Sequence, residues 1–387
     1  MSIAGSQAQV VLRLLAELRP SWHRDAALPA RIQSLLARHR EFGSRDRRLY
    51  RELIYTALRY LPWIEPLLDA QSDEALRRLG WLAAESPATK TFRAAFARGE
   101  PPAGDKAELL PAWFREHCPE AFEPGQIDAL LSRAPLWIRL QDDQPDRVAA
   151  QLAAEGWPVA PFPPWPSAWR LPDDINVTQN AAYLEGRIEI QDLGSQLILA
   201  SVGVNPSERW LDACAGAGGK TLQLAQLVGP VGHVVAHDIR PEALAELQLR
   251  AARAGLKNIT IAREPEGEFA GVLVDAPCSG TGTWRRAPHL KWSTTPAQIA
   301  AAAALQAKLL HRFSQCVAPG GRLVYATCSL SCQENESVIA QFLATHPNFA
   351  PAPFQRTFGF PLRGNGFTIL PATHDTDGFF VAVLRRA

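Results

Sequence analysis

Two short stretches of this chain place a cysteine where a folded enzyme can do chemistry. Asp275–Gly282 reads Asp-Ala-Pro-Cys-Ser-Gly-Thr-Gly, and Ala326–Ser329 reads Ala-Thr-Cys-Ser. Each follows a short apolar run typical of a buried parallel strand, so Cys278 and Cys328 are expected just beyond strand ends. Open α/β sheets bind ligands at the carboxyl ends of their strands. If these strands are neighbours they lie about 4.8 Å apart, and both sulfurs reach one planar substrate.

A thiol and an acid beside a planar base support a specific reaction. A thiolate that adds to carbon-6 of cytosine makes carbon-5 nucleophilic, and carbon-5 then attacks the methyl group of S-adenosylmethionine. Loss of the carbon-5 proton and of the thiolate restores the ring. An acid beside ring nitrogen-3 assists, because the addition places charge there.

The thiol itself needs local help. A free thiol, with a pKa of about 8.5, is mostly protonated at pH 7. Four basic side chains that follow Cys278 closely are candidates for that help or for contacts with an RNA backbone: Arg285, Arg286, His289 and Lys291.

The elements that position these groups follow from the pattern after Tyr183, where strands and helices alternate. Strands are predicted at Arg209–Ala213, His233–Asp238, Asn258–Ala262, Gly271–Asp275 and Arg322–Tyr325. Helices are predicted at Lys220–Val228, Pro241–Ala254 and Pro296–Val317. This alternation predicts a doubly wound α/β sheet with right-handed crossovers.

The C-terminal part is expected to complete this sheet. Ser331 with Glu334 three residues later predicts a capping box for a helix that runs to Thr345. Two apolar stretches, Gly366–Leu370 and Phe379–Leu384, predict an antiparallel hairpin at the sheet edge.

The first 130 residues have apolar side chains at three and four spacing, which predicts helices. These are Val10–Leu18, Leu28–Arg38, Arg45–Tyr60 with Ser44 as N-cap, and Glu74–Ala84. Residues 1–60 carry 11 Arg against 5 Asp and Glu, a local balance of 11 − 5 = +6. The arginines are interpreted either as a solvated helical face or as an RNA-backbone face.

A small linking subdomain is predicted at residues 131–185. It has a strand at Pro135–Leu140, a helix at Pro145–Glu155 and a stretch rich in proline and tryptophan at Trp157–Pro172. That stretch is expected to be an irregular loop.

The turn Leu211–Thr221 contains three glycines between a predicted strand and a predicted helix. A phosphate-binding P-loop needs glycine where Cys214 stands, so that interpretation fails. A dinucleotide fingerprint needs Gly or Ala where Thr221 stands. An S-adenosylmethionine turn needs only the bend and an acid after the next strand, which Asp238 supplies. Dinucleotide enzymes place an acid there too, so the turn alone leaves both cofactors open.

These motifs together resemble the RsmB/NOP/Sun family of RNA cytosine carbon-5 methyltransferases. The resemblance covers about residues 135 to 387, and the N-terminal helices resemble the NusB-like RNA-binding domain of its bacterial members. It rests on the two thiol stretches, Gly218–Thr221, Gln191-Asp192, Glu334–Glu336 and Asp377–Phe380. It implies a Rossmann-like class I methyltransferase sheet, mostly parallel, after an all-helical N-terminal domain. The implied domains are residues 1–130, 131–185 and 186–387.

The resemblance also implies roles for individual residues. The residues alone do not choose between the thiols, whereas the resemblance makes Cys328 the nucleophile and Cys278 the residue that assists product release. Asp275 would contact the base or the cofactor. The implied S-adenosylmethionine site contains Cys214, Ala215, Gly216, Ala217, Gly218, Gly219, Lys220 and Asp238, with Lys220 facing the cofactor carboxylate or ordering the turn.

The chain departs from the family pattern at two places. Gly216-Ala217 stands where the family most often has Ala-Pro. The stretch Ile261–Glu264 lacks the usual Asp that holds the adenine, and Glu264 is the expected substitute.

Composition limits the remaining classes. Hydrophobic residues make up 47% of the 387, with a net charge of +1, and no apolar run approaches the roughly 20 residues of a membrane span. Six cysteines in so long a chain indicate reduced thiols and a cytoplasmic protein. Cys118, Cys316 and Cys332 are interpreted as structural, and no metal is expected, because Cys328 and Cys332 lack a second pair of ligands.

The sequence therefore predicts a monomeric RNA methyltransferase that forms 5-methylcytosine. Ribosomal RNA is the expected substrate because of the N-terminal helices, and transfer RNA is the second candidate. Two other classes stay open: an RNA-binding assembly factor without turnover, and a nicotinamide oxidoreductase, which would explain the glycines and Asp238 but neither thiol.

Overall fold

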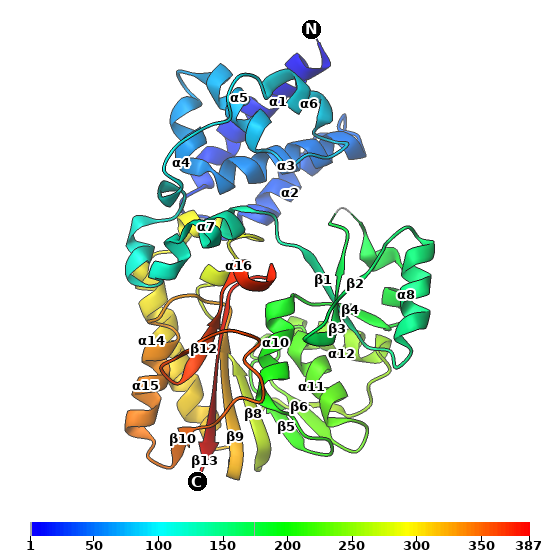
Figure 1. The fold of residues 1–387 in the computed structure, drawn as a ribbon, viewed down its shortest axis with the longest axis vertical. Coiled ribbons are helices and arrows are strands. Elements are labelled where there is room, and N and C mark those ends of the chain that lie inside the picture. The colour runs from blue at the N-terminus through cyan, green and yellow to red at the C-terminus, as the bar shows by residue number, and fades with distance from the viewer. Residues whose placement is uncertain (1, 174) are drawn as a thin grey trace. The chain divides into compact units, whose positions relative to one another are not determined.

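The computed structural model describes residues 2–173 and 175–387, and its contacts divide the chain into two units. The first, here called the helical unit, contains the residues up to Ser132 together with Trp284–Thr295. The second, the sheet unit, contains Arg133–Thr283 and Pro296–Ala387 (Figure 1). The three-part division 1–130, 131–185 and 186–387 stays a prediction.

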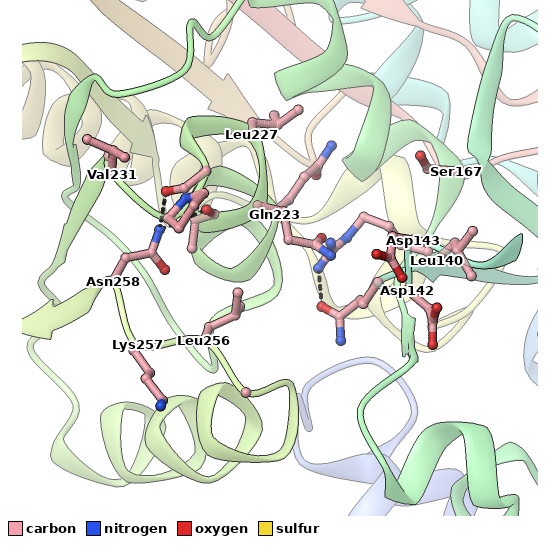
Figure 2. Close-up of a pocket in the computed structure, with 18 of the residues that line it drawn as sticks. Leu140, Asp142, Asp143, Ser167, Gln223, Leu227, Val231, Leu256, Lys257 and Asn258 are labelled. Carbon is pink, nitrogen blue, oxygen red and sulfur yellow. Dashed lines mark hydrogen bonds between the residues drawn. The ribbon is translucent and has the colours of Figure 1, made fainter.

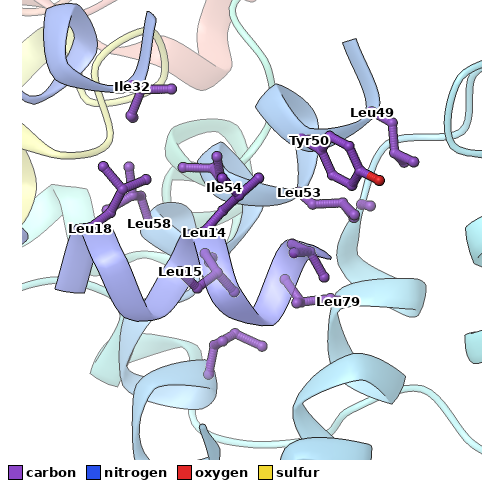
Figure 3. Packing of buried hydrophobic residues seen from close by; sticks show 14 of the residues in the cluster. Leu14, Leu15, Leu18, Ile32, Leu49, Tyr50, Leu53, Ile54, Leu58 and Leu79 are labelled. Carbon is purple, nitrogen blue, oxygen red and sulfur yellow. The ribbon is translucent and has the colours of Figure 1, made fainter. Parts of the chain in front are cut away.

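The helical unit is held together by one apolar core. Its helices are α1 (Ile3–Leu18), α2 (Leu28–Arg38), α3 (Ser44–Arg59), α4 (Leu61–Ile64), α5 (Ser72–Leu82), α6 (Lys90–Phe96), α7 (Pro124–Leu131) and α13 (Leu290–Ser293). In this core Leu18 of α1 lies beside Leu58 of α3, and Leu14 of α1 lies beside Ile54 of α3 (Figure 3). Helix α3 begins at Ser44, one residue earlier than predicted, and Gly43 takes the cap position.

The segment Trp284–Thr295 belongs to this core although it follows the Cys278 turn in sequence. Trp292 packs against the helical core, and its Nε1 donates to the carbonyl oxygen of Leu58 at 2.6 Å. The Lys291 side chain is buried, and its Nζ donates to the carbonyl oxygen of Arg59 at 2.8 Å. The hypothesis that Arg285 and Lys291 act on the thiol or on RNA is therefore wrong, because both are only 2% exposed inside the helical unit.

The sheet unit begins with a small antiparallel sheet in the order β2-β3-β1-β4. Its strands are β1 (Leu136–Leu140), β2 (Ala160–Phe162), β3 (Trp165–Leu171) and β4 (Ile188–Ile190), with helices α8 (Pro145–Ala154) and α9 (Ala181–Leu184). The prediction of an irregular loop at 157–172 is wrong, because β2 and β3 lie there. Edge strand β2 tolerates Pro161, since an edge strand leaves one row of N–H groups unpaired.

The main sheet has the strand order β11-β12-β13-β9-β8-β5-β6-β7, with β10 paired to β13. Strands β5 to β9 are parallel, whereas β12 and β13 form the predicted antiparallel edge. The strands are β5 (Arg209–Asp212), β6 (His233–Ala236), β7 (Ile259–Ile261), β8 (Phe269–Asp275), β9 (Val317–Thr327), β10 (Phe349–Pro351), β11 (Leu362–Arg363), β12 (Gly366–Ile369) and β13 (Phe379–Arg386).

Helices cover both faces of the main sheet, as the alternating pattern predicts. They are α10 (Leu193–Val202), α11 (Gly219–Val228), α12 (Pro241–Arg253), α14 (Pro296–Ser314), α15 (Glu336–Thr345) and α16 (Pro371–His374). Leu197 and Leu224 pack with Leu273 on one face, whereas Phe313 and Phe342 pack with Val272 on the other. The fold is thus the expected Rossmann-like sheet. Within the described residues, every helix falls short of the length and apolarity that a membrane span requires.

Candidate active site

The two thiols lie together at the carboxyl ends of adjacent strands. Strands β8 and β9 are parallel neighbours, with Asp275 in register with Ala326, so this part of the expectation is confirmed. The turns beyond them bring Cys278 Sγ to 3.3 Å from Cys328 Sγ. Both side chains are half-buried. Two sulfurs at this separation can face the same small group.

A pair of glycines lets three chain segments approach at this point. The Gly282 N–H donates to the carbonyl oxygen of Cys328 at 2.9 Å, and the Gly378 N–H donates to the carbonyl oxygen of Gly282 at 2.7 Å. A Cβ on Gly282 would lie 2.1 Å from the Gly378 oxygen, and a Cβ on Gly378 would lie 2.9 Å from the Gly282 Cα. Only glycine fits at both positions, which ties the Cys278 turn to the start of β13.

The Gly-rich turn links β5 to α11 and bends through two residues with positive φ, Gly216 at 54° and Gly218 at 91°. A Cβ on Gly218 would meet Leu247 Cγ at 2.7 Å, whereas a Cβ on Gly219 would meet no atom nearer than 4.0 Å. Open space therefore adjoins the N-terminus of α11, where backbone N–H groups favour a carboxylate. These residues fit the methionine end of S-adenosylmethionine.

Asp238 lies beside the same turn, after β6. Its Oδ2 accepts the Gly216 N–H at 2.8 Å, and Arg240 donates to both of its oxygens. Burial alone raises the pKa of this carboxyl, but the hydrogen bonds from Arg240 and Gly216 outweigh burial and lower the pKa overall. Asp238 is thus held ionised, as a carboxylate that binds ribose hydroxyls must be.

Lys220 connects the Gly-rich turn with the thiol site. Its Nζ donates to Asp275 Oδ2 at 2.8 Å and lies 5.6 Å from the centre of the Phe379 ring. Burial lowers the Lys220 pKa, but the charges of Asp275 and Cys328 outweigh it, so the pKa is raised. Lys220 stays an ammonium close enough to Cys328 to interact with its charge.

Two buried groups before the Gly-rich turn carry raised pKa values. Burial raises the pKa of Asp212, at the end of β5, to about 7, although Thr221 Oγ1 donates to its Oδ2 at 2.7 Å. Burial and the nearby Asp212 charge also raise the pKa of Cys214. Cys214 therefore stays a neutral thiol. The sequence analysis did not single out Asp212, which looks like any acid at a strand end.

Glu264, the expected adenine contact, is directed elsewhere. Its carboxylate pairs with Arg312 at 2.7 Å, and its side chain is 78% exposed. The neighbouring Ala262 carbonyl oxygen instead contacts His237 Nδ1 at 3.1 Å. A role for Glu264 with adenine stays a prediction that requires this exposed ion pair to break.

Glu334 does not take the position that its spacing from Ser331 predicts. The predicted capping box is wrong, because α15 begins at Glu336 with Asn335 as its cap. Glu334 is instead fully buried between the thiol turns. The three-residue spacing of Ser331 and Glu334 is compatible with a helix cap and with a buried carboxylate between the thiol turns. The local sequence does not distinguish the two.

A cavity of about 770 Å³ lies away from the thiols. Its lining includes His233 and Asn258, at the starts of β6 and β7, so it lies at the amino ends of the parallel strands. The thiols lie beyond the carboxyl ends of β8 and β9. Asp142 and Asp143 line its other side, and Asn258 hydrogen-bonds across part of it (Figure 2). The chemistry therefore does not use this cavity.

The other cysteines show no second site. All six cysteines are free thiols. Among residues 2–173 and 175–387, no group of three or more His, Cys, Asp or Glu side chains is arranged to hold a metal ion.

Known proteins resemble this chain in sequence. The family description 16S rRNA methyltransferase RsmB/F matches residues 200–385. A probable ribosomal RNA small subunit methyltransferase B from Synechocystis sp. is 37% identical over 298 residues, which cover 72% of this chain and 67% of the relative.

Solved structures share the fold. A methyltransferase homolog protein from Pyrococcus horikoshii has a TM-score of 0.62 at 27% identity, over 71% of this chain and 93% of its own. The structure titled PH0851 covers the whole of both chains with a TM-score of 0.75, and at 23% identity it shows the fold alone. The family is shown by the Synechocystis relative, which is 37% identical over 67% of its own length, so the chain belongs to the RsmB/F methyltransferase family whose description matches residues 200–385.

Proposed function

We propose that this chain transfers a methyl group from S-adenosylmethionine to carbon-5 of cytosine in ribosomal RNA. The observation that carries the proposal is the pair of sulfurs 3.3 Å apart at neighbouring strand ends, beside the Lys220–Asp275 ion pair. Methyl transfer to oxygen or nitrogen needs no thiol, whereas transfer to an unactivated ring carbon needs a nucleophile that adds to the ring first.

The cofactor site is proposed to comprise residues 214–220 and Asp238. S-adenosylmethionine, when bound, supplies an electrophilic methyl group. Asp238 must release Arg240 before it can accept ribose hydroxyls. The Arg240 side chain is 58% exposed and can turn into solvent, whereas the Asp238 side chain is only 6% exposed, so the ribose hydroxyls must replace the hydrogen bonds that Arg240 gives up. Lys220 holds Asp275 in place next to the ring of the base.

The thiols are proposed to act in a fixed order. The hydrogen bond with Cys328, followed by burial, raises the pKa of Cys278 well above its ordinary value, so Cys278 begins as a thiol. Cys328, which interacts with the Lys220 ammonium, adds to carbon-6 of cytosine. Once Cys328 is a thioether it no longer carries the charge that kept Cys278 protonated. Cys278 can then ionise and take the carbon-5 proton, and the bond between Cys328 and carbon-6 breaks.

Ribosomal RNA is proposed as the substrate because the Synechocystis relative is named for the small ribosomal subunit. The helical unit is proposed to bind RNA as a NusB-like domain. Its helix α3 exposes Arg45, Arg47, Arg48 and Arg51, a spacing of positive charge that suits a phosphate backbone. A target base in a stem must leave its stack, which costs a few kcal/mol.

Methyl transfer from labelled S-adenosylmethionine tests the proposal. The acceptor is RNA from a strain that lacks this gene, either as separate ribosomal and transfer RNA fractions or as partly assembled ribosomal particles. Nucleoside mass spectrometry should find the label in 5-methylcytosine of the ribosomal fraction. Label only in transfer RNA would reassign the substrate, and no label in any acceptor would favour a non-catalytic RNA-binding role.

A further inference from the structure

One buried carboxylate joins the two thiol turns. Glu334 is 0% exposed. Its Oε1 accepts the Ser279 N–H at 2.8 Å and Gln306 Nε2 at 3.0 Å. Its Oε2 accepts Ser329 Oγ at 2.6 Å and the hydroxyl of Ser279. The donors come from three segments: the turn after β8, the turn after β9, and α14.

Further hydrogen bonds surround this contact and keep it in place. Gln306 Nε2 also donates to the carbonyl oxygen of Pro277, which precedes Cys278, at 3.0 Å. The Tyr325 hydroxyl donates to the Glu334 backbone carbonyl at 2.5 Å, and the Thr281 and Ser329 hydroxyls lie 3.0 Å apart. Moving either turn therefore breaks several hydrogen bonds at once, and Glu334 stands at the centre of them.

The charge of the Glu334 carboxylate also affects the pKa of Cys278. A buried ionised carboxylate is tolerated when its oxygens are hydrogen-bonded, and these four donors satisfy them. All four donors are neutral, so they leave the negative charge in place beside Cys278. A nearby negative charge disfavours a second one. Glu334 is accordingly among the causes that raise the Cys278 pKa, after the Cys328 hydrogen bond, burial and the Cys328 charge.

We propose that Glu334 is a positioning residue of the methyl-transfer site, which holds the Cys278 turn against the Cys328 turn and places a negative charge beside Cys278. The proposal rests on the proposed function and deepens it, because it explains why two cysteines at similar strand ends take different roles. Glu334 touches neither substrate nor cofactor; it acts through Ser279, Ser329 and Cys278.

Two variants separate geometry from charge. Glu334→Gln keeps the size of the side chain and removes the charge, and Glu334→Asp keeps the charge and shortens the reach. Glu242→Gln is the matched control, because it removes one exposed carboxylate at the start of α12. Circular dichroism and thermal unfolding first establish that each variant is folded.

The main readout needs neither RNA nor cofactor. Alkylation of Cys278 by iodoacetamide is followed against pH by peptide mass spectrometry. In Glu334→Gln the pH midpoint should fall, because the neighbouring charge is gone. In Glu334→Asp and in Glu242→Gln the pH midpoint of Cys278 alkylation should stay within a few tenths of a pH unit of the wild-type midpoint. An unchanged midpoint in folded Glu334→Gln would overturn the role of the charge.

The second readout is methyl transfer. Both Glu334 variants should lose roughly tenfold or more in kcat, with the KM for S-adenosylmethionine within about twofold, because the turns lose their register while the Gly-rich turn does not. Wild-type kcat in both would overturn the positioning role.

A milder change covers the case in which Glu334→Gln does not fold. Ser279→Ala removes one hydroxyl donor and keeps the N–H, and it should lower kcat about threefold to tenfold. Wild-type kcat in Ser279→Ala would then count against the proposal. A wild-type enzyme without activity on any RNA would refute the proposed function, and the alkylation profiles would still decide the role of Glu334.

Discussion

The turn after β8 and the turn after β9 look alike in sequence, yet they give their thiols different surroundings. Each turn follows a parallel strand, and each has serine immediately after cysteine. Cys278 lies beside the buried Glu334 carboxylate, whereas Cys328 interacts with the Lys220 ammonium. The difference teaches that position at a strand end makes a thiol available, while the groups on neighbouring elements give each thiol its own electrostatic surroundings.

Removing each thiol in turn is the strongest way to break this comparison. Cys328→Ala should lower methyl transfer by at least about 10⁴-fold and form no covalent complex with RNA, because the nucleophile is lost. Cys278→Ala should accumulate a covalent protein–RNA complex, because addition proceeds and release does not. Denaturing gels with labelled RNA measure both outcomes. Covalent complexes in Cys328→Ala would reverse the assignment.

Oxidation tests whether the two thiols act as one pair. The sulfurs are 3.3 Å apart and need to close only to about 2.05 Å to form a disulfide. Diamide, which accepts two electrons and two protons, should couple Cys278 to Cys328 and abolish activity, and dithiothreitol should restore it. Peptide mapping identifies the bond. Cys332, which is exposed, serves as control: the activity of Cys332→Ala should be as sensitive to diamide as that of wild type. In Cys278→Ser, whose turnover is already blocked, Cys328 should stay open to iodoacetamide after diamide treatment, whereas in wild type it should not. Equal loss of Cys328 alkylation in Cys278→Ser would contradict the pairing.

The Lys220 ammonium provides a sharper test of the charge difference. Lys220→Met should slow methyl transfer by roughly 100-fold, because it removes a fixed positive charge next to Asp275 and Cys328. Alkylation of Cys328 near neutral pH should slow as well, while that of Cys278 should not. Lys257→Met, at an exposed lysine of the same unit, is the control. Equal slowing of both thiols would indicate a general disturbance of the site.

The smallest effect is expected at Asp212, a buried carboxyl at a strand end that has no reacting thiol. A substitution there tests whether burial of this carboxyl changes how stability depends on pH. Its pKa is raised from 3.8 to about 7, so between these values the folded state binds more protons than the unfolded state. Stability therefore falls as pH rises through this window, by up to about 4 kcal/mol. Asp212→Asn removes this loss. Relative to wild type, its melting temperature should rise between pH 4 and pH 8 in thermal unfolding of the cofactor-free protein. A constant difference across that range would show that Asp212 ionises freely.

Much of the sheet unit was predictable from local pattern. Buried parallel strands such as Val272–Val274 read as continuous apolar runs, and the glycines of the turn after β5 punctuate them. The meeting of the two thiols also followed, because parallel neighbours end at the same edge of a sheet.

The failures have physical reasons as well. Strand β2 was not predicted because prolines usually interrupt strands, although an edge strand accepts them. Glu334 was read as a helix cap because its spacing from Ser331 is the same in both uses. Lys291 was expected to help a thiol ionise or to contact an RNA backbone, because nothing in its local sequence tells which core a loop enters. Each of these misreadings concerns a residue whose partner lies far away in the chain.

The segment Trp284–Thr295 has a consequence for how the protein is made. Trp284 packs at a tilt against Phe114 with ring centres 4.6 Å apart, and Trp292 packs on the core of the first helices. On a ribosome, the helices up to Ser132 emerge well before these two tryptophans. At roughly 5–20 residues per second the delay is on the order of ten to thirty seconds. During that time the nascent helices expose the apolar surface that the two tryptophans later cover. The yield of folded protein therefore depends on translation speed and on chaperones that bind such surfaces, and not only on the stability of the finished fold.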